Sequence, residues 1–426
     1  MGSGRSNGSA KARGDRRRVR PWMALLAGMA VLTTMAAATA AGRPTSGRAS
    51  IGQATGANTT TPPIRHVWII ELENNSYSQS FGDPSADPYL ATTLPSEGAL
   101  LRNYYGIGHD SLDNYIAEVS GQAPTFQTGQ DCEYFTQFFQ FEGENFSRWT
   151  KDGQLSGDGC VYPPVVQTVG NQLSKAGLTW KAYEQDMGND PHRDGTTTTS
   201  HGPACGHPKL NHVDLTDTTG PANDSYATRH DPFMYFHSII DHQASCDAHV
   251  VTLAPLGQDL QSADTTPNYS FITPNTCSDA HDVPRCQDGE KGGLGQADAF
   301  LQTWVPQIVA SPAYRQGGLI VVTFDESGSD RDATACCGEA LSLGYTDPAH
   351  PNVNEPGLYG PGGGRVGAVL LSPYIAGGTV SVLPYNHYSL LRSVEDLFGL
   401  SHLGDAQEEG VSSFGSDVYT NWHPPA

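Results

Sequence analysis

Short runs of consecutive apolar residues constrain the fold of this chain more than any other feature. The segment 318–324, GLIVVTF, consists almost wholly of residues that buried strands favour. The segments 64–72 and 268–273 have the same character, and 178–183 and 365–374 are further predicted strands. Segments with helical patterns separate several of these runs. We therefore expect βαβ units and an α/β fold with a mostly parallel sheet.

Helical patterns occupy five segments of the chain, namely 112–119, 165–176, 231–242, 296–309 and 388–400. Gly177 directly follows the second of them, where glycine is a natural C-cap. Ser111 directly precedes the first. Its hydroxyl is therefore expected in the first turn of that helix or at its cap.

The first 41 residues have the order of an export signal. Residues 11–20 are basic, residues 22–32 are apolar, and Ala38-Thr39-Ala40 resembles a cleavage site. We expect cleavage and a secreted, extracellular protein. The alternative is an uncleaved membrane anchor over 22–41, which would hold the protein at the cell surface. No later stretch of the sequence is long and apolar enough to be expected in a membrane.

The charge balance limits the partners of the chain. The formal net charge is −21, and residues 1–41 hold seven of the 24 Lys and Arg but one of the 45 Asp and Glu. Their removal leaves a formal net charge of −27. The remaining chain is expected to consist of a flexible lead-in over 42–62 and a single domain over 63–420. So acidic a surface disfavours nucleic acid, and no nucleic acid binding is expected. It also repels an anionic substrate unless a bound cation compensates.

The sequence contains eight cysteines, namely Cys132, Cys160, Cys205, Cys246, Cys277, Cys286, Cys336 and Cys337. An even number in an exported chain predicts disulfides, which we expect to hold loop excursions such as 126–164. Cys277 and Cys286 are a plausible local pair. The adjacent Cys336 and Cys337 form either a vicinal disulfide or two separate bridges. The chain has no CxxC pair, which argues against a thiolate zinc site.

Polar residues follow three of the predicted strands at their carboxyl ends, where open α/β sheets bind ligands. They are Glu73 and Asn74, then Asp279, His281 and Asp282, and finally Asp325 and Glu326. Each group alone is equally well explained as a capped turn. Ser111 and His387, each before a predicted helix, would open on the same edge of the sheet. Oxygen ligands with one or two histidines suit Mg, Mn, Ca or Zn.

The ordered motifs of the chain resemble those of the bacterial phosphoesterase family of the alkaline phosphatase superfamily, which holds acid phosphatases and phospholipases C. The resemblance runs from residue 64 to 400 and rests on ELENNSY, GHDSLDNYIAEVSG, WKAYEQD, YATRHDP, PNTCSDAHD, VVTFDESG, GRVGAVLLSPYI and YNHYSLLRSVEDLFGL. It implies a three-layer sandwich with a mostly parallel central sheet, similar to alkaline phosphatase. It also implies one or two divalent metal ions per chain and one phosphoesterase domain over 63–420.

The same resemblance implies a role for each matching residue. A metal site is expected from Glu73, Asn74, Ser111, Asp279, Asp325 and Glu326. Catalytic roles are expected for Ser111 as the hydroxyl nucleophile and for His109, His281 and His387. Substrate contacts are expected from Asn114, His230 and Asp282. In two-metal relatives the Asp279, His281, Asp282 and His387 positions hold a second metal, and in single-metal members they contact phosphate.

The chemistry of these residue types fits such a reaction. A serine hydroxyl is a weak nucleophile until a base or a metal activates it. The helix that begins near Ser111 would direct backbone N–H groups at a phosphate. His281 or His387 could protonate the leaving oxygen. Together with the resemblance, these properties lead us to expect a phosphatase that hydrolyses small phosphate monoesters through a serine phospho-enzyme.

Two other interpretations remain open at this stage. The first is a phospholipase C or phosphodiesterase on the same scaffold. The second is an exported metal-binding protein without turnover, for which the histidine-rich region 192–249 is the best support. Cys205 within that region is expected to be in a disulfide rather than a metal ligand.

Overall fold

The described part of the chain consists of residues 61–141, 148–150, 153–217, 220–281, 286–328, 332–338 and 362–423 of a computed structural model. These residues all belong to one compact unit, Gly56–Ala426. The predicted export signal 1–41, most of the lead-in 42–62, and Asp282 lie outside them. None of the helices in these ranges combines the length and the apolar character that a bilayer crossing needs.

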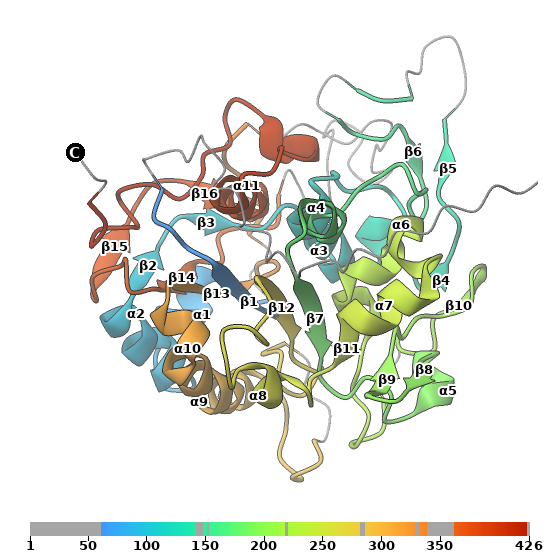
Figure 1. Cartoon of the computed structure of the whole chain (residues 1–426), viewed down its shortest axis with the longest axis horizontal. Helices are drawn as coiled ribbons and strands as arrows, with labels where there is room; N and C mark the ends of the chain where they lie inside the picture. The colour runs from blue at the N-terminus through green and yellow to red at the C-terminus, as the bar shows by residue number, and fades with distance from the viewer. Residues whose placement is uncertain are drawn as a thin grey trace, which may run out of the picture. The chain divides into compact units, whose positions relative to one another are not determined.

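A ten-stranded sheet forms the centre of the described fold (Figure 1). Its strand order is β15 (Thr379–Ser381), β2 (Ala99–Leu101), β14 (Ala368–Leu371), β13 (Gly318–Phe324), β1 (His66–Leu72), β12 (Tyr269–Thr273), β7 (Trp180–Glu184), β11 (Val250–Thr252), β9 (Gly202–Ala204) and β8 (Thr197–Thr199). The strands from β13 to β11 are parallel, while β14 and β9 run against their neighbours. The prediction of a mostly parallel sheet is confirmed.

The central strand β1 brings the predicted strand ends together. It lies between β13 and β12, with Leu72 paired to Phe324 and Val67 to Tyr269. All seven residues of β1 and all seven of β13 are buried, which is why both read as apolar runs. Because Leu72 and Phe324 are partners, the residues that follow them leave the sheet at the same edge.

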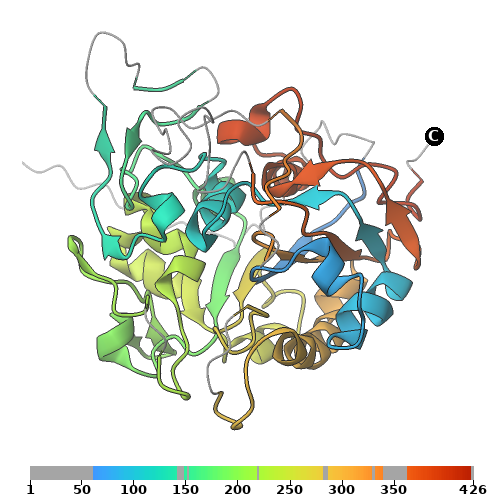
Figure 2. The ribbon, with the colours of Figure 1, turned by 180° about the vertical axis from the view of Figure 1, so that it is seen from behind.

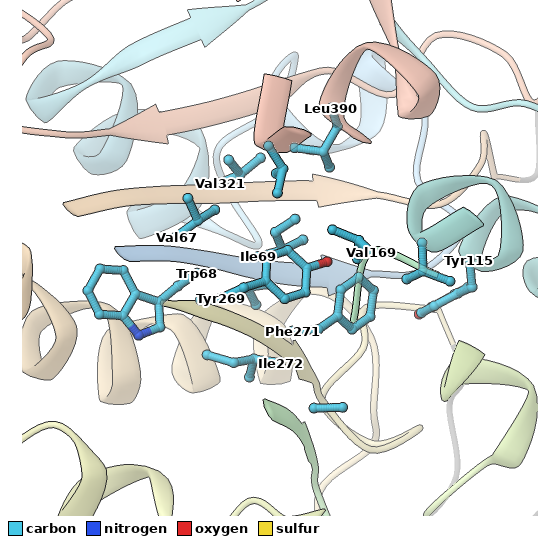
Figure 3. Packing of buried hydrophobic residues seen from close by; sticks show 14 of the residues in the cluster. Val67, Trp68, Ile69, Tyr115, Val169, Tyr269, Phe271, Ile272, Val321 and Leu390 are labelled. Carbon is cyan, nitrogen blue, oxygen red and sulfur yellow. The ribbon is translucent and has the colours of Figure 1, made fainter. Parts of the chain in front are cut away.

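Helices cover both faces of this sheet and make three layers. On one face, α3 (Ser111–Ser120), α4 (Val169–Ala176) and α11 (His387–Phe398) contact one another. On the other lie α2 (Leu94–Glu97), α8 (Leu256–Asp259), α9 (Leu294–Ala310) and α10 (Pro312–Arg315), as Figures 1 and 2 show from opposite sides. Figure 3 shows side chains of α3, α4 and α11 packed over the strands, with Trp68 on the opposite side. There Trp68 packs against Tyr314 of α10.

The remaining elements are short. They are the helices α1 (Tyr77–Ser80), α5 (Pro191–Asp194), α6 (His237–Ile240) and α7 (Gln243–His249), the π-helix Tyr89–Thr93, and the 3₁₀ turns Thr128–Gln130, Thr228–His230, Pro232–Tyr235 and Gly404–Gln407. Three two-stranded ladders pair β3 (Tyr104–Tyr105) with β16 (Tyr385–Asn386), β4 (Tyr134–Phe135) with β10 (His212–Val213), and β5 (Phe139–Gln140) with β6 (Gly157–Asp158).

Two segments differ from the prediction. The segment 231–242 is not one helix, because Pro232 starts a 3₁₀ turn and Phe236 is extended before α6 begins. The predicted strand 365–374 is shorter, and β14 pairs antiparallel with β13. The predicted helix 165–176 begins later than expected, because Thr168 caps α4 at Val169. Its end agrees, and Gly177 caps α4 with a φ of 76°, as expected of a glycine C-cap.

All eight cysteines are paired in disulfides. The bridges are Cys132–Cys160, Cys205–Cys246, Cys277–Cys286 and the vicinal Cys336–Cys337. The first closes the loop excursion over 126–164, and the third confirms the predicted local pair. Because Cys205 is bridged to Cys246, it is not a metal ligand in the histidine-rich region.

Candidate active site

A cavity of about 450 Å³ opens at the carboxyl ends of the central strands. Its lining comes from the segments after β1, β12 and β13, from the start of α3, and from the 3₁₀ turns near residues 130 and 229. It consists of Asn74, Asn75, Gln79, His109, Asp110, Ser111, Asp131, Arg229, Ala280, His281, Glu326, Ser327 and Gly328. The structure therefore brings five of the predicted site residues to one cavity. Glu73 and Asp325 are completely buried and do not line the cavity themselves.

The carboxylate of Glu73 is the convergence point of the site. Ser111 Oγ donates a hydrogen bond to Glu73 Oε2 at 2.7 Å, and the Tyr115 hydroxyl donates to Oε1 at 2.6 Å. His230 Nε2 lies 3.3 Å from the same Oε1. The ring of His230 also stacks on Tyr115, with centroids 5.5 Å apart. Glu73 therefore links the end of β1 to the serine hydroxyl and to His230.

Ser111 occupies the first position of α3, as the sequence predicts. The preceding residue, Asp110, has a φ of 75°, which turns the chain sharply into the helix. Asp131 accepts a hydrogen bond from the backbone N–H of Leu112 at 2.9 Å. Ser111 is only 4% exposed, yet it belongs to the cavity lining. A hydroxyl at a helix N-terminus faces the end of the helix that favours anions.

Asp325, Glu326 and Asn74 form the opposite side of the site. The backbone N–H groups of Asn74 and Glu326 donate to Asp325 Oδ1 at 2.7 and 2.6 Å. Asn74 adopts a φ of 45°, and its Nδ2 lies 2.6 Å from His281 Nδ1. His109 Nδ1 hydrogen-bonds to Glu326 Oε2, while the N–H of Asp110 donates to Oε1 at 3.1 Å. Both histidines are thus anchored at the cavity by neighbouring site residues.

The electrostatics of the site are those of acids taken out of water. Burial raises the pKa of Glu73 well above its ordinary value, and the Asp325 charge raises it further. Burial likewise raises the pKa of Asp325, with the Glu326 charge as the next cause. Burial lowers the pKa of the His230 imidazole well below its ordinary value, and Arg229 adds to this. Burial therefore favours the neutral form of the His230 imidazole beside this carboxyl group.

The donor atoms of this site fit a divalent cation. Asn74 Oδ1 and Asp325 Oδ2 are buried acceptors without a hydrogen-bond partner among the described residues. Together with the oxygens of Ser111 and Glu73 they form the hard oxygen set that Mg²⁺, Ca²⁺ or Mn²⁺ prefers. Asp279 lies next to this set, since its carbonyl accepts the N–H of Glu73 at 2.7 Å and its Oδ1 accepts that of His281 at 2.9 Å.

Asn114 and His387 are predicted site residues that also lie away from the cavity lining. Asn114 turns its amide to the loop before α3, where Oδ1 accepts from the N–H groups of Ile107 and Gly108 at 2.7 and 3.1 Å. Its Nδ2 donates to the carbonyls of Gly108 and Asp110. His387 is completely buried, and its Nε2 donates to the Asp325 carbonyl at 2.6 Å. Both residues therefore contact the framework of the site.

Tyr115, Arg229 and Asp131 belong to the site although the sequence-based set does not contain them. Tyr115 lies within the predicted helix 112–119, and the helical pattern gives no sign that its hydroxyl reaches Glu73. Arg229 precedes His230 in the YATRHDP motif, so that motif is the one available signal for it. Asp131 carries no sequence signal. Its Oδ2 lies 3.6 Å from Arg229 Nε, which ties this cation to the start of α3.

Fold and cavity together define an α/β protein with a serine hydroxyl on a buried carboxylate at the edge of its sheet. A model of the Phosphoesterase family matches residues 84–401, most of the chain. The chain therefore belongs to the phosphoesterase family. The match begins after β1, so Glu73 and Asn74 precede the matched range.

Curated relatives of this chain include fungal acid phosphatases. A probable acid phosphatase of Kluyveromyces lactis is 22% identical over 341 residues, which cover 80% of this chain and 60% of that protein. An acid phosphatase of Aspergillus fumigatus is 23% identical and a phosphate-repressible acid phosphatase of Penicillium chrysogenum 24%, over 79% and 80% of this chain and 55% and 59% of those proteins. The chain thus spans between about half and two thirds of the length of these relatives.

Similar solved structures include a protein in the alkaline phosphatase superfamily from Vibrio parahaemolyticus. It has a TM-score of 0.45 and 12% identity, and the likeness covers 84% of this chain and 73% of that one. That score is too low to add to what the family match shows.

Proposed function

We propose that this protein hydrolyses small phosphate monoesters and transfers the phosphoryl group to Ser111 in the process. The observation that carries the proposal is the 2.7 Å hydrogen bond from Ser111 Oγ to the buried carboxylate of Glu73, at the cavity end of α3. Membership of the phosphoesterase family supports the reaction class. The acid phosphatases among the curated relatives support monoesters as substrates.

The residues of the chain have separate roles in this proposal. Ser111 Oγ attacks phosphorus while its proton passes to Glu73, so the Oγ–P bond forms as the bond to the leaving oxygen breaks. Arg229, at the cavity lining, holds the phosphate oxygens. His281, at the cavity lining, donates a proton to the leaving oxygen. Water then attacks the phosphoserine and releases inorganic phosphate.

A divalent cation held by Asn74, Ser111, Asp325 and Glu73 belongs to this proposal. It would supply a positive charge beside the serine oxygen and the phosphoryl oxygens. The residues themselves support it, since the chain gathers buried acceptors there that no described donor satisfies. With a formal charge of −27 after signal removal, the protein also needs local cations to accept an anionic substrate.

The nucleophile is tested by Ser111→Ala, with Ser120→Ala as the matched control. Ser120 is also buried on α3, but its hydroxyl donates to the Ile116 carbonyl at 2.7 Å and does not line the cavity. We expect S111A to lose about three or more orders of magnitude in kcat for p-nitrophenyl phosphate, as nucleophile removal does in comparable enzymes. The S120A variant should keep its activity. Retention of more than a few per cent of activity in a folded S111A protein would exclude Ser111 as the nucleophile.

The substrate class is tested with a panel that shares one leaving group. Release of p-nitrophenol would be compared for the phosphate monoester, the bis-diester and the phosphorylcholine ester. We expect kcat/KM to be highest for the monoester. A preference for either diester would replace the proposal by the phosphodiesterase or phospholipase C interpretation.

The proposal also places the protein outside the cytoplasm. Four disulfides are typical of proteins that fold in an oxidising compartment. We expect the protein recovered from the culture medium to begin near residue 42. Intact mass measurement would check this, and a cell-bound protein that keeps residues 1–41 would favour the uncleaved anchor.

A further inference from the structure

A second group of ionisable side chains lies beneath the cavity, in the core of the protein. It consists of Glu71 from β1, Glu118 from α3 and His387 at the start of α11, which are 1%, 2% and 0% exposed. One ligand atom from each lies within 4.8 Å of the others. In the described part of the chain this is the one group of three or more His, Cys, Asp or Glu residues at such spacing. None of the three lines the cavity.

The hydrogen bonding of His387 fixes how its ring faces this group. Nε2 lies 2.6 Å from the Asp325 carbonyl, so Nε2 carries the proton and donates it. The other ring nitrogen, Nδ1, lies 2.8 Å from Glu118 Oε1. An imidazole nitrogen and a carboxylate oxygen therefore face each other in the core. The Tyr104 hydroxyl lies 3.1 Å from the same Nδ1.

Glu71 is the second observation that points to a ligand. Apart from the neighbouring Glu118 carboxyl, no described residue is a hydrogen-bond partner of its carboxyl group, although the side chain is almost completely buried. An unpaired carboxylate in the core costs several kcal/mol or more, so buried charges are normally paired or coordinate a metal. Strand alternation explains its direction, because Glu71 and Glu73 point to the face of the sheet that α3 covers.

We propose that Glu71, Glu118 and His387 bind a divalent transition-metal ion in the core, separate from the cavity. Two carboxylates and one cation of charge +2 sum to zero, which removes the repulsion between the two glutamates. An imidazole nitrogen among the ligands favours Zn²⁺ or Mn²⁺ over Mg²⁺ and Ca²⁺. The bond from His387 Nε2 to a backbone carbonyl is the outer contact that orients metal-binding histidines.

Such an ion would link three elements that position the residues of the cavity. Its ligands come from β1, which Glu73 follows, from α3, which begins with Ser111, and from α11, whose first residue contacts Asp325. The ion would act through position rather than through contact with substrate. The inference does not depend on the proposed hydrolysis, because it concerns residues that the cavity does not include.

Anomalous diffraction from crystals of the unmodified protein, purified without chelator, tests the site directly. Data collected on both sides of the zinc and manganese absorption edges should show a peak between Glu71, Glu118 and His387. A cavity ion would give a different peak beside Ser111, so failure of either proposal can be told from failure of the other. A difference map without a peak at the core group would overturn the core site and favour protons shared between Glu71 and Glu118.

Metal counting on variants provides an independent measurement. Glu118→Gln keeps the size of the side chain, and we expect it to bind one ion fewer per chain than the unmodified protein by native mass spectrometry. Glu395→Gln is the matched control, since Glu395 is a buried glutamate of α11 that accepts the Leu403 N–H instead. It should keep the full count. An unchanged count in folded E118Q would overturn the proposal.

Discussion

At the scale of single residues, the site depends on which polar groups are held by the chain and which face the cavity. The hydroxyl of Ser111 reaches the cavity, whereas the amide of Asn114, one turn later, is engaged by the backbone of residues 107–110. Both residues lie on α3 and were expected to contact substrate or metal. Their different surroundings lead to different expectations for substitution.

Asn114→Ala should weaken the protein more than it weakens substrate binding. The change removes Asn114 Oδ1, which accepts hydrogen bonds from the backbone N–H groups of Ile107 and Gly108. These buried N–H groups are then left without partners. We expect a loss of about 2–4 kcal/mol in the free energy of unfolding, measured by urea denaturation. A variant of unchanged stability with a strongly raised KM would show instead that Asn114 contacts the substrate.

At the scale of elements, the segment that follows β12 forms a loop that is closed by a disulfide. It carries Asp279 and His281 and is closed by the Cys277–Cys286 disulfide. His281 in turn lies 2.6 Å from the amide of Asn74, after β1. The orientation of His281 therefore depends on a loop rather than on the sheet itself.

The double substitution Cys277→Ser with Cys286→Ser should lower stability by about 2–3 kcal/mol, because a bridge across nine positions restricts the unfolded chain. We also expect kcat to fall, since His281 loses its anchored loop. Thermal unfolding and p-nitrophenyl phosphate turnover would measure the two effects.

The Cys336–Cys337 pair is the control for that experiment. Its two cysteines are adjacent in the sequence, so this disulfide restricts almost none of the unfolded chain, and its loss should cost little stability. A stability loss from C336S/C337S as large as that from C277S/C286S would contradict the explanation by loop closure.

Elements also show how far sequence patterns reach. The strand 318–324 matches β13 residue for residue, because a strand buried on both faces has an unbroken apolar sequence. The prediction of a single helix over 231–242 was wrong, because a proline at the second position of this segment starts a 3₁₀ turn. The antiparallel direction of β14 had no local signal, since direction is set by the partner strand.

At the scale of the whole molecule, the unusual feature is the amount of buried negative charge. Glu73 and Asp325 both have raised pKa values, caused first by burial. For such acids the folded protein binds more protons than the unfolded chain between the ordinary and the raised pKa. Without a cation, stability therefore falls as pH rises above about 4, the ordinary range of these acids.

Removal of metal should expose this pH dependence. We expect treatment with EDTA to lower Tm by several degrees at pH 8 and by less at pH 5, because the negative charge on acids with raised pKa values decreases as pH falls. Activity should fall with chelation and return with added Mg²⁺, Ca²⁺, Mn²⁺ or Zn²⁺. Differential scanning fluorimetry at both pH values would measure the shift. An equal Tm with and without EDTA at pH 8 would argue against a bound cation.

The sequence by itself determined the parallel strands and the helix near Ser111. It also contained the motifs, such as ELENNSY and VVTFDESG, that resemble those of the phosphoesterase family. These properties depend on residues close together in the chain, so local periodicity and spacing contain them. Only the tertiary structure decided which polar atoms meet. Glu71 had no role in the sequence, and it meets Glu118 and His387 because the sheet and two helices bring together residues far apart in the chain. Burial, which decides whether a carboxylate needs a cation, is a property of that packing.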